Sequence, residues 1–169
     1  MEYCLDTSVY IQAYRTYYAF DLAPRFWNAL ENLAQIQVII SPIAVYEELK
    51  KGNDELYIWA KSQENTLFIK PDDMVSDALH TIADFSNENY EDAHWIRDFL
   101  SGADPWVIAQ AKAYNLIVVT MEGNKSAEEI NNSTKRFLGR IKIPNMCGHF
   151  GVKCITTYDL LRAQQIKLG

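Results

Sequence analysis

The fold is decided by residues 102–122, which read GADPWVIAQAKAYNLIVVTME. Asp104 followed by Pro105 is typical of a helix start, where a side chain caps the helix and the N–H that proline lacks is not needed. Apolar residues at positions 107, 108, 111 and 114 share one helical face, and Asn115 suits a left-handed helix end. The pattern therefore predicts a helix that begins at this pair and ends at Asn115.

A short apolar run, Leu116-Ile117-Val118-Val119, follows that helix directly. Such a run favours a strand buried on both faces of a parallel sheet. Thr120 and Glu122 would then emerge at the carboxyl end of the strand, where ligands bind in open α/β sheets. We therefore expect Asp104 and Glu122 near one site. The simpler interpretation, a capping acid and a loop charge, stays open from this stretch alone.

The chain has 169 residues, of which 49% are hydrophobic and 22% charged, and this predicts one globular domain over 1–169. No apolar run approaches the roughly 18–20 residues that cross a bilayer, and the amino terminus does not resemble a secretory signal. We expect a cytoplasmic protein with no membrane contact. Three scattered cysteines do not indicate a disulfide framework.

The net charge of −6 disfavours nonspecific binding to polyanions, because it repels phosphate backbones. Residues 123–153 differ from the rest, since they hold six basic and two acidic side chains. We predict a loop-rich basic insertion there, in which Pro144 and Gly148 act as further breaks. A basic surface beside an acidic site and a merely solvated loop are both compatible with this composition.

Acidic residues recur where predicted strands give way to helices. Tyr3–Leu5 predicts a central first strand with Asp6 at its carboxyl tip, and Val38–Ile40 predicts a second strand. The helix after that second strand carries Glu47 and Glu48 in its first two turns. Together with the acids of the opening stretch, these side chains are expected to share one edge of the sheet.

The remaining chain is less informative. Leu67–Ile69 predicts a small edge strand and Val152–Thr156 a last strand, while the polar run 87–91 indicates a bend.

Several carboxylates held close together repel one another and have raised pKa values unless a hard cation neutralises them. Mg²⁺ or Mn²⁺ is the expected ion. A metal site built from carboxylates suits phosphodiester hydrolysis, because the ion offsets charge on the reacting oxygens. The sequence contains no Ser-His-Asp order, phosphate-binding glycine loop or zinc signature that would indicate another chemistry.

Four motifs in this order resemble the PIN-domain nucleases, a group that includes the VapC-type ribonuclease toxins. They are Leu5-Asp6-Thr7-Ser8, Val45-Tyr46-Glu47-Glu48-Leu49, Ala103-Asp104 with Ile108-Ala109-Gln110-Ala111, and Val118-Val119-Thr120-Met121-Glu122. The family usually ends the last motif in Thr-x-Asp, so Glu122 is a longer substitute. Of the two adjacent glutamates, Glu48 fits the family spacing Val-x-x-Glu-Leu.

The resemblance implies a three-layer α/β/α domain with a mainly parallel central sheet, and cleavage of single-stranded RNA. It also implies a homodimer and, for a toxin, an antitoxin protein that blocks the site. The long 123–153 region exceeds what a compact toxin of this group needs. The implied metal ligands are Asp6, Glu48, Asp104 and Glu122, and the hydroxyls that would steady them are those of Thr7, Ser8 and Thr120.

Three functions compete at this point. The first is an Mg²⁺- or Mn²⁺-dependent endoribonuclease, and the second is a noncatalytic PIN-like adaptor that binds RNA or protein. The third is a phosphatase or phosphoacceptor with Asp6 as nucleophile, which the sequence disfavours because Ser8 stands where such sites carry a second acid.

Overall fold

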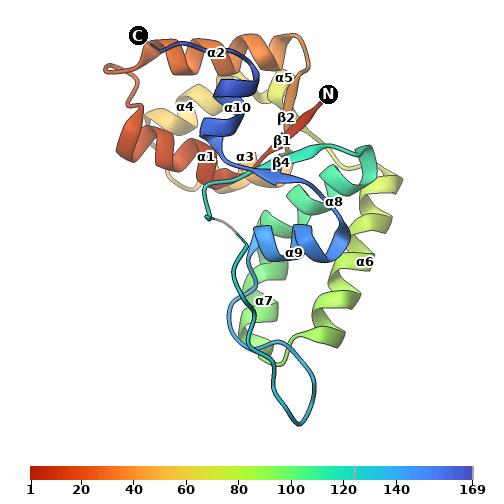
Figure 1. The fold of residues 1–169 in the computed structure, drawn as a ribbon. Coiled ribbons are helices and arrows are strands. Elements are labelled where there is room, and N and C mark those ends of the chain that lie inside the picture. The colour runs from red at the N-terminus through yellow and green to blue at the C-terminus, as the bar shows by residue number, and fades with distance from the viewer. Residues whose placement is uncertain (124, 169) are drawn as a thin grey trace.

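The computed structural model describes residues 1–123 and 125–168. In this part of the chain a five-stranded sheet lies between layers of helices (Figure 1). All its strands are parallel and follow the order β3-β2-β1-β4-β5. They are β1 (Tyr3–Leu5), β2 (Ile39–Pro42), β3 (Phe68–Ile69), β4 (Ile117–Val119) and β5 (Cys154–Ile155). The prediction of an α/β fold with a parallel sheet and a central first strand is confirmed.

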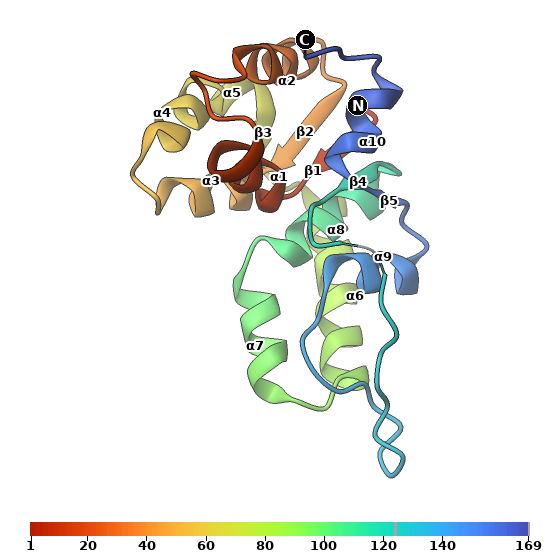
Figure 2. The same ribbon diagram turned by 60° about the vertical axis from the view of Figure 1, so that its left-hand side comes forward.

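Helices cover both faces of the sheet. Figures 1 and 2 show α2, α4, α5 and α10 on one side and α6, α8 and α9 on the other. The helices are α1 (Thr7–Gln12), a π-helical turn (Ala13–Tyr17), α2 (Pro24–Gln35), α3 (Ile43–Lys50), α4 (Glu55–Ser62), α5 (Glu64–Leu67), α6 (Asp73–Asn89), α7 (Ala93–Ser101), α8 (Asp104–Tyr114), α9 (Ile143–Phe150) and α10 (Thr157–Ala163).

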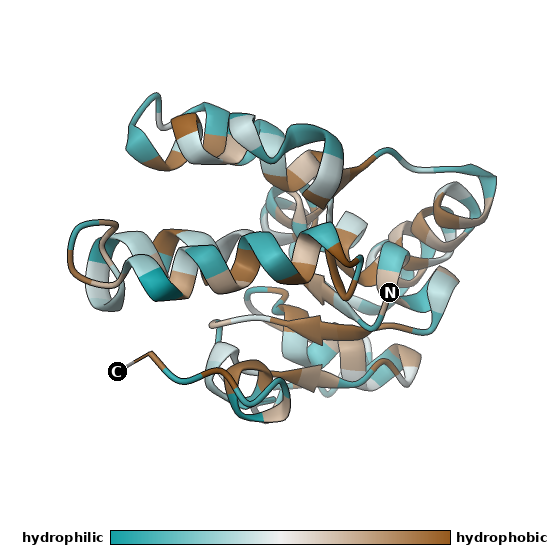
Figure 3. Ribbon diagram, turned by 90° about the horizontal axis from the view of Figure 1, so that it is seen from above, coloured by the Kyte–Doolittle hydropathy of each residue, from teal (hydrophilic) through white to brown (hydrophobic). Residues whose placement is uncertain are grey.

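The central strands form the middle of the hydrophobic core. Leu5, Ile40 and Val118 have no exposed surface, as expected for strands with helices on both faces. Figure 3 shows the strand arrows in brown, the hydrophobic end of the scale, whereas the surrounding helices carry both colours. The apolar runs of the sequence therefore become strands because neither face meets water.

The strand register brings the residues after β1 and β4 together. Leu5 pairs with Val119, so Asp6 and Thr120 are the next residue on each of two neighbouring strands. The Asp6 N–H still donates to the Val119 carbonyl at 2.9 Å. Parallel strands thus place both side chains at the same edge of the sheet.

The start of α8 differs from the sequence prediction. Ala103 is the capping residue, Asp104 is the first residue inside the helix, and no side chain caps this end. Pro105 therefore occupies the second position, which it tolerates because N–H groups in the first turn have no partner within the helix. The carboxylate of Asp104 is consequently not used for capping. The left-handed end at Asn115 is confirmed, with φ 53° and ψ 47°.

The expected breaks at Pro144 and Gly148 are wrong, because both lie inside α9. Proline at the second helical position loses no hydrogen bond, and the buried side chains of Ile143 and Met146 stabilise the helix against the core. The predicted insertion is therefore helical over Ile143–Phe150.

Two smaller boundaries also differ. The bend predicted at 87–91 is helical as far as Asn89, where Asn87 and Asn89 each donate a 2.9 Å hydrogen bond to the carbonyl four residues earlier. The last strand is limited to Cys154–Ile155.

Among the residues that the structure describes, none of the helices is both long enough and apolar enough to cross a membrane.

The packing predicts that two leucine-to-alanine substitutions change the free energy of unfolding by very different amounts. Leu30, on α2, has no exposed surface, whereas Leu22 is 80% exposed. Leu30→Ala should lower the free energy of unfolding by about 2–5 kcal/mol, because it removes buried methyl groups and leaves a cavity. Leu22→Ala should change it by less than about 0.5 kcal/mol. Urea unfolding of both variants measures this, and equal losses would contradict the described core.

Candidate active site

One cavity at the carboxyl edge of the sheet collects all four predicted acids. It has a volume of about 350 Å³ and is lined by Asp6, Glu48, Asp104 and Glu122. Asp6 follows β1, Glu48 lies on α3, Asp104 begins α8, and Glu122 follows β4. Four elements that are distant in sequence therefore supply one carboxylate each.

Asp6 is held by three donors on one oxygen. Its Oδ2 accepts hydrogen bonds from the Ser8 N–H (3.3 Å), the Ser8 hydroxyl (2.5 Å) and the Thr120 hydroxyl (2.9 Å). Those hydroxyls in turn accept the N–H groups of Met121 and Glu122, at 2.9 and 3.2 Å. Each hydroxyl proton is therefore directed at Asp6. Asp6 also caps α1, because the Ser8 N–H that bonds to Oδ2 belongs to the first turn of this helix. Asp6 can therefore cap the helix and line the cavity at the same time.

Of the two adjacent glutamates, only Glu48 lines this cavity. Its Oε2 accepts the Thr7 hydroxyl at 2.6 Å, and its Oε1 accepts the Ala103 N–H at 2.8 Å. Glu47 is exposed, and its Oε2 lies 3.7 Å from the Lys50 Nζ. Adjacent helical positions point about 100° apart, which explains the division.

Glu122 reaches beyond its own strand. Its Oε2 accepts the N–H of Ile143, the first residue of α9, at 2.9 Å. A carboxylate is stabilised at a helix amino terminus by the unpaired N–H groups and the helix dipole. Asp104 differs from the other three acids, because no side chain or N–H among the described residues donates to its carboxylate.

The charges of the acids act on one another. Burial, followed by the charges of Asp6, Glu122 and Glu48, raises the pKa of Asp104 to about 8, although Arg140 acts in the opposite direction. Burial also raises the pKa of Asp6 to about 6, against the lowering effect of its hydroxyl donors. Asp6 therefore ionises first, and adding a second charge at Asp104 is the more costly step.

Other residues line the cavity that sequence reasoning did not select: Lys51, Asp98, Ser101 and Arg140. Arg140 belongs to the basic region, but no motif around it in the sequence indicates that it lines a cavity with the acids. Asp98 lies within α7, away from any strand end. The positions of Asp98, Ser101 and Arg140 depend on how α7 and residues 125–142 pack in the folded chain, which local sequence does not encode.

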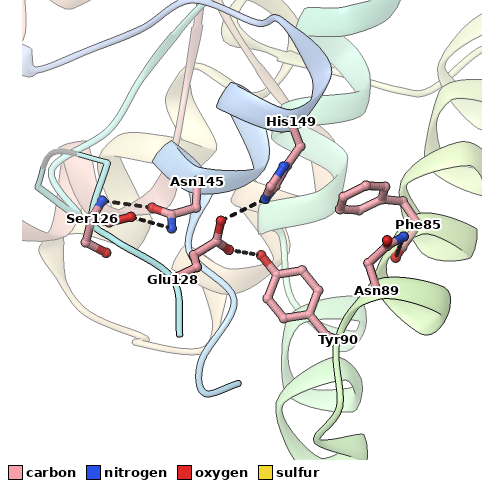
Figure 4. Close-up of polar contacts among 7 residues, drawn as sticks. All are labelled: Phe85, Asn89, Tyr90, Ser126, Glu128, Asn145 and His149. Atoms are coloured by element: carbon pink, nitrogen blue, oxygen red, sulfur yellow. Dashed lines mark hydrogen bonds and ion pairs between the residues drawn. The ribbon is translucent and has the colours of Figure 1, made fainter. Parts of the chain in front are cut away.

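Ser126 and Glu128, at the start of the basic segment, bond to α9 and to Tyr90 at the end of α6 (Figure 4). The Ser126 N–H donates to the Asn145 Oδ1 at 3.1 Å, and the Asn145 Nδ2 donates back to the Ser126 carbonyl at 3.0 Å. Glu128 bonds to the His149 ring at 2.8 Å and accepts the hydroxyl of Tyr90. The basic segment that leads into the cavity is thereby attached to two helices.

A family described as a domain of unknown function, DUF4411, matches residues 3–168. The chain belongs to this family. The chain is also similar in structure to VapBC2 from Rickettsia felis, solved bound to a DNA fragment from its promoter. That similarity has a TM-score of 0.48 and 18% identity, and covers 92% of this chain and 98% of the other. No curated protein matches the sequence.

The cavity of this DUF4411 protein offers oxygen ligands, the type that Mg²⁺ and Mn²⁺ prefer. Within 1–123 and 125–168, however, no three His, Cys, Asp or Glu side chains are grouped as a ready-made metal cage. The expected convergence is therefore only partial, because Glu48 and Glu122 are directed toward backbone N–H groups. This arrangement fits Mg²⁺, which usually keeps several waters and binds through one or two carboxylates.

The raised pKa of Asp104 predicts a pH effect on the stability of this DUF4411 protein. A carboxyl that is harder to ionise when folded contributes full stability below about pH 4, and loses it as the pH rises toward 8. Without metal, the wild type should therefore melt at a lower temperature at pH 8 than at pH 5. Asp104→Asn, which carries no charge, should remove much of this decrease. Thermal melts in chelator measure it, and identical pH profiles for the two proteins would contradict the assigned charge repulsion.

Proposed function

We propose that this chain is an Mg²⁺- or Mn²⁺-dependent endoribonuclease that hydrolyses phosphodiester bonds of single-stranded RNA. The observation that carries the proposal is the shared cavity at the carboxyl edge of a parallel sheet, which is lined by Asp6, Glu48, Asp104 and Glu122. Ligands bind at this edge in open α/β folds. The order of the acids along the sequence also resembles that of the PIN-domain nucleases.

Asp6 and Asp104 would hold the ion most directly. Asp6 is buried and fixed through Oδ2, and Asp104 has no donor among the described residues. Glu48 and Glu122 would contribute through bound water, because each already accepts a backbone N–H. When bound, the divalent ion supplies positive charge that offsets the phosphate oxygens and makes water easier to deprotonate.

The protein groups have separate tasks in this proposal. Ser8 and Thr120 orient Asp6 by donating their hydroxyl protons to its Oδ2. Asp104, with a pKa of about 8 in the metal-free cavity, holds a proton on its carboxyl and releases it when positive charge enters. Lys51 and Arg140 line the same cavity and provide the positive charge that attracts a phosphate backbone.

An exposed glutamate outside the acidic cavity supplies a matched control for a test of catalysis. Asp6→Asn and Glu48→Gln should each lower the rate of metal-dependent cleavage of single-stranded RNA by at least about 100-fold, because they remove charge that positions the ion and the phosphate. Glu88→Gln should leave the rate within about twofold, since Glu88 is exposed on α6 and does not line the acidic cavity. Cleavage of a labelled RNA by purified protein measures these rates, and circular dichroism verifies folding.

Unchanged turnover in folded Asp6→Asn would contradict the proposal. So would an equal loss in the Glu48→Gln and Glu88→Gln variants, because only Glu48 lines the acidic cavity.

A second function, the noncatalytic adaptor, is favoured by one specific observation. Asp6, Glu48 and Glu122 already accept hydrogen bonds inside the protein. An adaptor would bind RNA or protein without metal. Calorimetric titration with MnCl₂ separates the two functions, because the nuclease predicts binding that Asp104→Asn weakens by about tenfold or more. RNA binding without detectable Mn²⁺ binding would favour the adaptor.

The resemblance to VapC-type toxins extends the proposal to two protein partners, an antitoxin and a second copy of this chain. Both extensions rest on the sequence motifs. An antitoxin would act by covering the acidic cavity, since that is where the proposed chemistry takes place.

A further inference from the structure

A second pocket of about 310 Å³ adjoins the acidic cavity. It lies between the start of α3 and the first turns of α8, and its walls include Ile43, Trp106 and Gln110. Glu48 and Lys51 line both hollows, as do Ser101 and Gly102. The two pockets therefore lie side by side, with these four residues between them.

Gln110 is the unusual residue of this pocket. Its side chain is 1% exposed, yet neither its Nε2 nor its Oε1 has a hydrogen-bond partner in the part of the chain that the structure describes. Its neighbours on α8, Ile108, Ala109 and Ala111, are apolar and buried. Leaving a buried donor and a buried acceptor unpaired destabilises the folded protein, and an apolar residue would avoid this. A ligand that offers an acceptor beside a donor would satisfy both groups of the amide.

Trp106 is the second residue of this pocket that could bind a ligand. It lies one turn before Gln110 on α8, and residues four apart on a helix are neighbours on its surface. Its indole is partly exposed and lines the pocket. Aromatic side chains of this kind bind unpaired bases by stacking, and amide side chains pair with the donors and acceptors on base edges.

We propose that this pocket binds one base of single-stranded RNA, stacked on Trp106 and hydrogen-bonded by Gln110. The inference rests on the proposed function, because it places the base next to the phosphodiester in the acidic cavity. Lys51, which lines both hollows, would pair with the phosphate of the linking nucleotide. The pocket would therefore determine which base the nuclease accepts beside the bond it cleaves.

Binding measurements test the base pocket separately from catalysis. Short oligoadenylate, oligouridylate and oligocytidylate, each carrying a fluorophore, are titrated with Asp6→Asn protein in Mg²⁺, so that the RNA stays intact. Trp106→Leu should weaken binding of every oligonucleotide by roughly 5- to 100-fold, because it removes the stacking surface. Gln110→Met should reduce the differences in affinity among the oligonucleotides, because it removes the hydrogen bonds that read the base edge.

The control variants exclude a general structural effect. Gln110→Met should melt at the same temperature as its parent or higher, since it replaces an unsatisfied amide by an apolar side chain of similar length. Gln35→Met is the matched substitution at an exposed glutamine at the end of α2, and it should leave RNA affinity unchanged.

Failures of the two proposals are distinguishable. The wild-type protein could fail to cleave RNA while its RNA binding still depends on Trp106 and Gln110. That result would overturn the proposed nuclease function and retain the base pocket. Active cleavage with RNA affinities unaffected by both variants would overturn the base pocket alone. The Trp106→Leu and Gln110→Met variants could instead keep their RNA affinity and bind a protein partner more weakly. That result would also overturn the base pocket and would assign the pocket to the protein partner.

Discussion

Three hydrogen bonds to a single oxygen of Asp6 are the constraint on which the rest of the site depends. They come from Ser8, beside it on α1, and from Thr120, beyond the neighbouring strand, so they join the ends of β1 and β4. Burying a carboxylate is costly unless it is hydrogen-bonded, and these donors offset that cost. Within the described residues, no hydrogen bond ends on the second oxygen, Oδ1. The parallel register makes the arrangement possible, because it ends both strands at the same level.

The fold follows from local patterns. The apolar runs at β1, β2 and β4 and the helix from Asp104 to Tyr114 are recognisable because each uses a signal of a few residues. Parallel strands share one carboxyl edge, so the shared location of Asp6, Asp104 and Glu122 also follows. The prediction was less accurate at α9, where Pro144 and Gly148 suggested breaks but burial of the apolar face stabilises a helix.

The details of the site depend on contacts that local sequence does not contain. Glu122 was predicted as a ligand, but its length lets it bond to the amino terminus of α9, which had not been predicted. Arg140 reaches the cavity after a segment that Ser126 and Glu128 attach to α9, and that Glu128 and Phe137 attach to the end of α6. Gln110 resembles any helical glutamine until the structure places it, without a partner among the described residues, inside a pocket. Under the two proposals, the acidic cavity and the neighbouring pocket of this chain would form one extended surface for RNA.

The central claim is that the four carboxylates form a site for a hard divalent cation. The most direct measurement is a crystal structure of the protein soaked in MnCl₂, with anomalous diffraction data collected to locate manganese. The account predicts an anomalous peak within coordination distance of Asp6 and Asp104, with water completing the ligand shell. A manganese peak elsewhere on the protein, or a cavity that stays free of manganese at saturating concentration, would contradict it.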